Sequence, residues 1–115
     1  MKPISPIINF DDFSKLDLRI GTIIRAEHFA EARKPAIKLW IDFGTLGVKK
    51  SSAQITHRYK PENLINRQVI TVINFPPKQI ANFLSECLVL GAINEQNEVV
   101  LLNPEFSVVK GGEVK

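Results

Sequence analysis

The segment Lys49–Gln54 gathers cationic and hydrogen-bonding side chains at close spacing. It reads Lys49-Lys50-Ser51-Ser52-Ala53-Gln54, with two cations, two hydroxyls and one amide. Lysine ammonium groups can neutralise phosphate, while serine and glutamine can hydrogen-bond phosphate, sugar or exposed base edges. The same residues also fit the exposed edge strand of a sheet, where lysines discourage aggregation. On this segment alone, the two interpretations are evenly balanced.

A second segment, Asn74-Phe75-Pro76-Pro77-Lys78-Gln79, adds an amide, an aromatic ring and a cation. It follows a β-branched run and contains two consecutive prolines, so we expect a rigid loop after a strand. Loops of that kind carry binding groups held by the scaffold. The alternative is a turn in which Phe75 fills the core, and both interpretations stay open.

The charges are distributed unevenly along the chain. Residues 33–78 contain nine Lys and Arg residues and only two acids, which gives a local charge of +7. Residues 1–32 carry −1 and residues 79–115 carry −3, in agreement with the net charge of +3. A basic middle between acidic flanks attracts polyanions more strongly than the net charge suggests. A well-solvated surface is the alternative, but strand-like segments could place several of these bases on one face.

No constellation in the sequence points to catalysis. His28 and His57 lie far apart and lack Cys or carboxylate partners at metal-ligand spacing, so we expect no metal site. The glycines match no phosphate-binding loop, and there is no nucleophile elbow. Cys87 lies in an apolar run, which favours an inert core thiol over a nucleophile. We therefore expect a binding protein without enzymatic activity and without a cofactor.

Length and composition predict one domain over residues 1–115, with its core at about 10–110. Hydrophobic content of 44% and charged content of 23% are typical of a soluble globular protein. A single cysteine excludes an internal disulfide. The first residues lack the apolar stretch of a signal peptide, and no run approaches the roughly 18 apolar residues of a membrane span. We expect a cytoplasmic protein without membrane insertion.

Short strands dominate the elements that would position these side chains. We expect a helical turn at 11–16, a short helix at 61–65, and strands at 18–27, 36–43, 48–55, 68–74, 87–93 and 98–102, the last two joined as a hairpin. Alternation through 36–43 predicts one buried face, made of Ile37, Leu39, Ile41 and Phe43. Gly21 is expected at a bulge or tight bend. This order predicts an all-β protein, a five-stranded OB-fold barrel, which binds oligonucleotides on one face.

Two aromatic residues stand near the bases. Trp40 shares the Lys38 face of its strand and so lies outside the predicted core. It could stack on a base or fill a subunit interface, where Trp is enriched, and we favour the interface. Tyr59, between Arg58 and Lys60, is the better candidate for contact with a base, with a partly exposed loop ring as the alternative.

Several segments resemble a known family. Asp17-Leu18-Arg19-Ile20-Gly21-Thr22-Ile23 is similar to the opening signature of the tRNA-binding-domain family, which includes modules appended to aminoacyl-tRNA synthetases. Within that family, four further segments resemble the CsaA-type bacterial chaperones, namely Glu31–Leu39, Ser51–Thr56, Asn74–Ile80 and Ser85–Gly91. The similarity runs from about Phe10 nearly to the C-terminus.

The resemblance implies an OB-fold homodimer, with short N- and C-terminal extensions that help to build the interface. It also implies an export-related chaperone that holds unfolded polypeptide, in a domain credited with binding tRNA. The recognition pattern of the synthetase-type modules is matched at Asn74, Pro77, Lys78 and Ser85. However, Asn82 replaces a glycine of that pattern and Cys87-Leu88 replaces its Gly-Met. These differences argue against elbow-specific tRNA recognition and leave the chaperone branch intact.

Two functions remain, and they differ in ligand. The favoured one is a homodimeric export-related chaperone that binds unfolded or pre-export polypeptides and can also bind tRNA or other structured RNA. The alternative is a dedicated tRNA-binding module that acts in trans on tRNA or on synthetases. The expected peptide-binding residues are Phe75, Pro76, Pro77, Lys78, Ile80 and Phe83. The expected nucleic-acid-binding residues are Lys34, Lys38, Lys49, Lys50, Ser51, Ser52, Gln54, Arg58, Asn74, Lys78 and Ser85, with Trp40 at the dimer interface.

Overall fold

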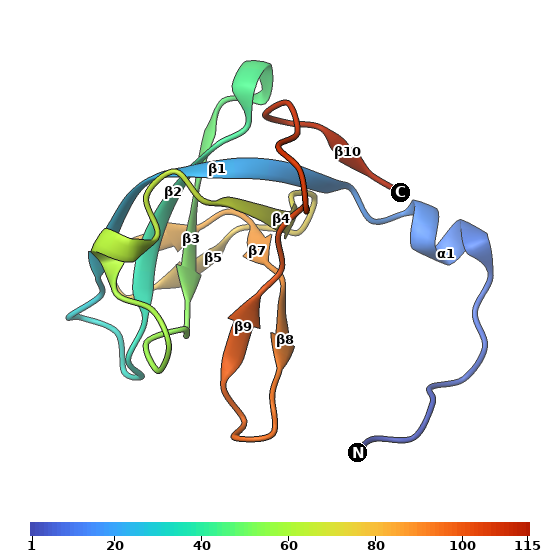
Figure 1. Ribbon diagram of the computed structural model, residues 1–115, viewed down its shortest axis with the longest axis horizontal. Helices are drawn as coiled ribbons and strands as arrows, with labels where there is room; N and C mark the ends of the chain where they lie inside the picture. The colour runs from blue at the N-terminus through green and yellow to red at the C-terminus, as the bar shows by residue number, and fades with distance from the viewer.

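Strand β1 (Leu18–His28) runs through the middle of the computed structural model, which describes residues 1–115 (Figure 1). The other strands are β2 (Ile37–Asp42), β3 (Val48–Ala53), β4 (Gln68–Val72), β5 (Lys78–Ile80), β6 (Phe83–Ser85), β7 (Leu88–Val89), β8 (Gly91–Ile93), β9 (Val99–Leu101) and β10 (Glu113–Val114). Helical structure is limited to α1 (Phe10–Ser14) and the 3₁₀ turns η1 (Gly44–Leu46) and η2 (Pro61–Asn63). None of these helices is long and apolar enough to cross a membrane.

The strands form a curved antiparallel sheet that is nearly closed into a barrel. The main sheet has the order β3-β2-β1-β4-β7, and β10 also pairs with β1. Its two ends meet where β3 lies against the Ser85–Cys87 segment. There the Glu86 N–H donates to Lys50 O at 2.7 Å, and the Ser52 N–H donates to Ser85 Oγ at 3.1 Å. The predicted all-β barrel of OB-fold type is confirmed.

Alternation along β2 produces the barrel core. Ile37, Leu39 and Ile41 are fully buried, as is Phe43 just beyond the strand. They pack in one cluster with Ile23, Ile55, Leu64, Val69 and Cys87. Each such side chain contributes about 1.5–3 kcal/mol through burial. A one-residue slip of β2 would expose this whole face, so the cluster determines the register of the strand.

Gly21 serves close packing. A Cβ atom at this position would lie 2.6 Å from Phe43 Cε1 and would also overlap Ile41, so only glycine lets β1 approach the core here. The irregularity in the pairing of β1 with β2 lies between Ile23 and Arg25. Gly21 therefore does not mark the irregularity in the pairing, which lies farther along β1. The glycine is needed instead for close packing against Ile41 and Phe43.

Two predictions for the second half of the chain need correction. Residues 87–93 do not form one strand: β7 pairs with β4, and the Leu90 N–H still donates to Ile70 O at 2.9 Å, after which the chain leaves the main sheet. Strand β7 stays in the sheet, whereas β8 forms a separate hairpin with β9, as predicted for the turn between them. Residues 74–79 are not only a loop: they lead into β5, which forms a second hairpin with β6.

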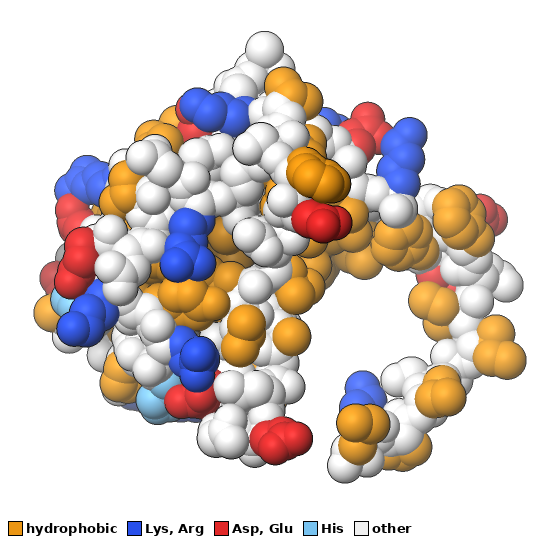
Figure 2. All heavy atoms as spheres, in the orientation of Figure 1, with side chains coloured by type: hydrophobic (Ala, Val, Ile, Leu, Met, Phe, Trp, Pro, Cys, Tyr) orange, Lys and Arg blue, Asp and Glu red, His pale blue; other side chains and the backbone are white.

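The N-terminal residues extend away from the barrel as an arm, residues 1–9, followed by α1 (Figure 1). The Asn9 N–H donates to the Asp12 carboxylate at 3.0 Å, which caps the start of the helix. The apolar side chains of the arm have little cover within the chain, since Ile4 and Ile7 are each 99% exposed. Figure 2 shows these hydrophobic side chains separated from the body of the protein by open space.

The C-terminal segment closes over the turn at η1. The Asp42 carboxylate accepts hydrogen bonds from the Gly44 N–H at 2.9 Å and from Lys110 Nζ at 3.0 Å. Together, first the backbone bond and then the lysine, they lower the pKa of Asp42. Gly111 has a φ of +85°, and a Cβ there would lie 2.5 Å from Phe43 O. Glycine is therefore required for this segment to dock on the barrel.

Candidate ligand-binding groove

Three adjoining hollows form a groove on one side of the barrel. The first, of about 630 Å³, lies between the 31–36 connection, the end of β3 and strand β5. The second, of about 300 Å³, borders it along Ser52, Gln54, Lys78 and Ile80. The third, of about 430 Å³, borders the first along Lys34 and Gln54 and reaches the β8–β9 hairpin. We call the three hollows together the groove; Gln54 lines all of them.

The groove combines unpaired cations with apolar side chains. Arg33, Lys34 and Lys78 line it and form no ion pair within the chain. Its acidic residues are Glu31 in the first hollow and Glu86 in the second. The apolar side of the second hollow is made of Phe75, Pro76, Ile80 and Leu88. The groove therefore attracts anionic groups while it offers apolar surface.

An aromatic cluster lies on the outer face of β2 and β3, next to the groove. Cross-strand pairing places Lys38 opposite Ser52 and Trp40 opposite Lys50, on the face away from the core. The β5–β6 hairpin brings Phe83 onto this face, where its ring packs at an edge-to-face angle against Trp40, with centroids 5.7 Å apart. The cluster thus joins the outer face of the sheet to the hairpin that borders the groove.

Three cations lie over the rings of this cluster. The Arg25 guanidinium carbon is 4.3 Å from the centroid of Trp40, Lys38 Nζ is 5.2 Å from that of Phe29, and Lys50 Nζ is 5.2 Å from that of Phe83. Such contacts contribute about 0.5–2 kcal/mol each and hold long side chains in place. We call the rings and their cations the cationic platform, made of Arg25, Phe29, Lys38, Trp40, Lys50 and Phe83.

The structure brings many of the predicted residues together. Those that line the groove as expected are Lys34, Ser52, Gln54, Phe75, Pro76, Lys78, Ile80 and Ser85. Lys38 and Lys50 belong to the platform. Lys49 points to the opposite face of β3 from Lys50, because successive residues of a strand alternate. Pro77 is exposed but lines none of the three hollows.

Three predicted contact residues have structural roles. Ser51 is only 1% exposed, and its hydroxyl donates to Cys87 O at 2.8 Å. Phe83 is 5% exposed and supports the cationic platform from below. Both groups of the Asn74 amide are hydrogen-bonded within the chain. Ser51 faces the core and Phe83 is covered by Trp40 and Lys50 on the outer face, so the structure does not place either side chain at the surface of the groove, and their predicted ligand contacts stay predictions.

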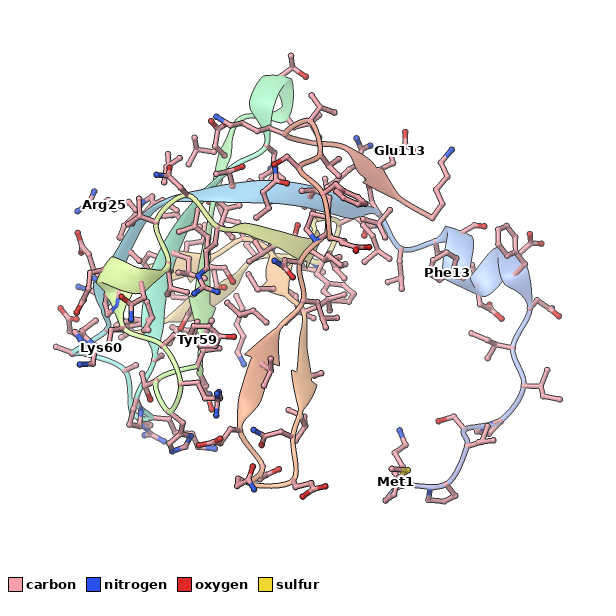
Figure 3. The ribbon with its side chains drawn as sticks, in the orientation of Figure 1. Met1, Phe13, Arg25, Tyr59, Lys60 and Glu113 are labelled. Atoms are coloured by element: carbon pink, nitrogen blue, oxygen red, sulfur yellow. The ribbon has the colours of Figure 1, made fainter.

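Three further predictions concern the far end of the groove and the outer face. Arg58 pairs with Glu98 at 3.4 Å, so its charge is partly neutralised. Tyr59 packs against the core with a partly exposed ring, and its hydroxyl accepts a bond from the Leu101 N–H at 2.9 Å, so it has a structural role and its contact with a base stays a prediction. In Figure 3, Tyr59 lies within the barrel, whereas Lys60 lies at its periphery. Trp40 is half-buried, and its place in a dimer interface stays a prediction.

Sequence reasoning missed three charged residues of the groove, namely Glu31, Arg33 and Glu86. Arg33 stands beside Lys34 in the same basic run, and that adjacency is the signal that could have identified it. No comparable signal marks Glu31 or Glu86 as a groove residue, and Glu86 is placed there by tertiary contacts. Its carboxylate accepts a bond from the Lys50 N–H at 3.0 Å, across a contact between β3 and a segment far along the chain.

The chemistry of Cys87 agrees with a structural role. Its thiol is buried, and burial raises its pKa to about 12. The Sγ atom donates to Lys50 O at 3.7 Å. A neutral, buried thiol is a poor nucleophile and a poor metal ligand. No cluster of three His, Cys, Asp or Glu side chains could hold a metal ion.

Comparisons with known proteins agree with this geometry. A family model described as "Putative tRNA binding domain" matches residues 18–113. The chaperone CsaA of Bacillus anthracis str. Ames is 56% identical with a TM-score of 0.91, over 96% of this chain and 100% of that one. The CsaA chaperone of Picrophilus torridus is 53% identical with a TM-score of 0.88, over 95% and 100%. A methionine–tRNA ligase of Parabacteroides distasonis is 37% identical over 114 residues, 99% of this chain but 16% of the ligase.

The family match and the CsaA similarities each cover most of the chain, including the segments that build the barrel and the groove. The start of β1, with Gly21 packed against the core, lies in the segment that carries the family resemblance. Residues 74–80 and 85–91 contribute the β5 border of the groove and the closure of the barrel. The chain therefore belongs to the tRNA-binding-domain family and, within it, to the CsaA type.

Proposed function

We propose that the chain is a homodimeric, export-related chaperone that holds unfolded polypeptide in the groove and binds tRNA through the same groove and the adjacent platform. The observation that carries the proposal is the position of Gln54, where three hollows meet and cations and apolar side chains border one channel. The family description and the CsaA structures support these two ligand classes.

For tRNA, the groove supplies positive charge, and the adjacent platform enlarges this cationic surface. Arg33, Lys34 and Lys78 have no carboxylate partner, so their charge is available to phosphates. Ser52 and Gln54 line the same channel and can hydrogen-bond phosphate, sugar or base edges. Recognition here is driven mainly by charge and should therefore respond strongly to salt.

For polypeptide, the groove offers a free strand edge beside apolar side chains. β5 pairs with β6 along one edge only, and its residues line the first hollow. An extended peptide can add to such an edge through main-chain hydrogen bonds. Phe75 and Ile80 would supply apolar contacts, with Lys78 steering the approach. This mode suits unfolded chains of varied sequence, because main-chain bonding needs no particular side chain.

For dimerisation, the arm and α1 supply uncovered apolar surface. Ile4, Ile7 and Phe10 are 99%, 99% and 77% exposed. A further hollow of about 380 Å³ lies between α1 and β10, beside Phe13 and Val114. A second copy of the chain would cover this surface by two-fold pairing. Sedimentation should show a dimer at micromolar concentration, and removal of residues 1–9 should weaken it; a stable wild-type monomer would contradict this part of the proposal.

The second candidate is a dedicated tRNA-binding module that acts in trans on tRNA or on synthetases. The observation that favours it is the similarity to a 16% segment of a methionine–tRNA ligase. Competition separates the two candidates. The displacement of labelled tRNA by a chemically unfolded, reduced polypeptide should be followed by fluorescence anisotropy, with the same polypeptide in its folded form as control.

Displacement by the unfolded form alone is the result expected of a chaperone with a shared groove. The Lys78→Ala variant should weaken both ligands, whereas Lys60→Ala, which removes the same charge outside the groove, should weaken neither strongly. Tight tRNA binding that no unfolded polypeptide displaces, with no detectable binding of that polypeptide, would support the dedicated module instead.

A further inference from the structure

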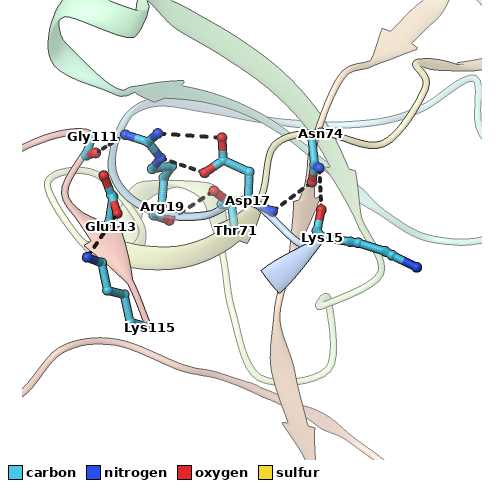
Figure 4. A network of polar contacts seen from close by, with 8 residues as sticks. All are labelled: Lys15, Asp17, Arg19, Thr71, Asn74, Gly111, Glu113 and Lys115. Carbon is cyan, nitrogen blue, oxygen red and sulfur yellow. Dashed lines mark hydrogen bonds and ion pairs between the residues drawn. The ribbon is translucent and has the colours of Figure 1, made fainter. Parts of the chain in front are cut away.

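The side chain of Asn74 joins two parts of the molecule that are far apart in sequence. Its Oδ1 accepts a bond from the Asp17 N–H at 2.9 Å, and its Nδ2 donates to Lys15 O at 2.7 Å. These two backbone groups belong to the short link between α1 and β1. Figure 4 shows both bonds converging on the one amide. Asn74 therefore holds the point at which the arm and α1 leave the barrel.

The barrel side of this junction is held independently. The Asp17 carboxylate accepts a bond from Arg19 Nε at 2.6 Å, and the Arg19 guanidinium also donates to Gly111 O at 3.0 Å. Thr71 Oγ1 donates to Arg19 O at 3.1 Å (Figure 4). The start of β1 is thus fastened to β4 and to the C-terminal segment without Asn74. The distinct contribution of Asn74 is the link to Lys15 and hence to α1.

Asn74 is also continuous with the groove. The next two residues, Phe75 and Pro76, line the second hollow, and Lys78 lines both the first and the second. Two consecutive prolines stiffen the chain between Phe75 and Lys78, so a displacement of this border is transmitted along it. The same short segment therefore touches the groove on one side and the base of α1 on the other.

We propose that Asn74 is a positioning residue, which ties the direction of α1 and the arm to the conformation of the Phe75–Lys78 border of the groove. A ligand that shifts this border then also shifts the arm. In return, a second copy of the chain that covers the arm changes the affinity of the groove for its ligand, because such coupling is reciprocal. The functional part of this inference rests on the binding of tRNA proposed above; the positioning itself does not.

The experiment compares amide hydrogen exchange by NMR in the wild type, Asn74→Ala and Asn74→Asp, with Asn103→Ala as a matched control at an exposed site outside the junction. In Asn74→Ala, the exchange rate of the Asp17 amide should rise by about tenfold or more, and the resonances of Phe75 and Lys78 should shift. The exchange rates and resonances of β2 and β3 should stay unchanged. Asn74→Asp keeps an acceptor for the Asp17 N–H and should preserve its protection while releasing Lys15. Unchanged exchange at Asp17 in folded Asn74→Ala would overturn the positioning role.

Titration with tRNA then separates positioning from direct contact. Folded Asn74→Ala should bind tRNA within about threefold of the wild type, and tRNA should perturb residues 15–17 in the wild type but not in this variant. A loss of affinity as large as that of Lys78→Ala would identify a direct contact and overturn the proposal. If the wild type binds no tRNA, the proposed function fails, while the exchange data still decide whether Asn74 positions α1.

Discussion

Replacing Lys78 by alanine offers the sharpest test of the groove. Lys78 lines the first and second hollows and has no ion-pair partner in the chain. A protein that neutralises phosphates releases counterions, so the logarithm of affinity falls with the logarithm of salt by about 0.7–0.9 per phosphate. Loss of one cation from the groove should therefore reduce the magnitude of the salt slope by about 0.7–0.9.

The wild-type slope follows from the cations that the groove and platform present. The unpaired ones are Arg33, Lys34, Lys38, Lys50 and Lys78. If each neutralises one phosphate, about five phosphates give a slope of about −3.5 to −4.5, and affinity falls roughly 100- to 500-fold between about 50 and 200 mM salt. With Lys78→Ala, about four phosphates remain, and the same change in salt lowers affinity by roughly 50- to 150-fold.

The assay is fluorescence anisotropy of labelled tRNA at four or more salt concentrations, with Lys60→Ala as control. Lys60 lies at the periphery of the barrel and lines none of the hollows, so its removal changes net charge equally without touching the groove (Figure 3). The control should leave the slope unchanged. A wild-type slope smaller than about 1 in magnitude, or equal effects of the two substitutions, would refute the assignment of phosphate contacts to the groove.

Three further predictions concern stability and reactivity. Gly111→Ala should lower the free energy of unfolding by about 1–3 kcal/mol, because φ is +85° and the new Cβ would meet Phe43 O; an unchanged urea midpoint would contradict this. The pKa of Asp42 is lowered by its bond from the Gly44 N–H and then by that from Lys110, so these bonds stabilise the fold above the ordinary pKa of 3.8, and this stabilisation is lost as pH falls through the folded pKa. Urea midpoints measured from neutral to acidic pH should therefore fall less steeply in Asp42→Asn than in the wild type. Cys87, with a pKa of about 12, should react with iodoacetamide at about pH 8 at least about 100-fold more slowly in the native protein than in urea, as read by intact mass; equal rates would show an open thiol.

Much of the fold could be predicted because its signals are local. The alternation of Ile37, Leu39 and Ile41 with polar residues depends only on strand periodicity, and all three side chains are buried as expected. Pro61 marks the 3₁₀ turn η2, and the 94–97 turn marks the β8–β9 hairpin. The division of residues 87–93 into β7 and β8 could not be predicted, because it depends on the pairing partners, with β7 on β4 and β8 on β9.

By itself, the sequence determined strands β1 to β4, the buried face of β2, the basic middle of the chain and the resemblance to its family, because these depend on periodicity, composition and motif order. Only the tertiary structure decided which polar side chains are free to contact a ligand and which are hydrogen-bonded within the chain. Ser51 and Ser52 are adjacent and chemically identical, yet one hydroxyl is buried against Cys87 and the other residue lines the groove. Asn74 likewise looks like a ligand contact but bonds to the base of α1. The physical reason is that a hydrogen-bond partner distant along the chain is chosen by how the barrel closes, which no local pattern encodes.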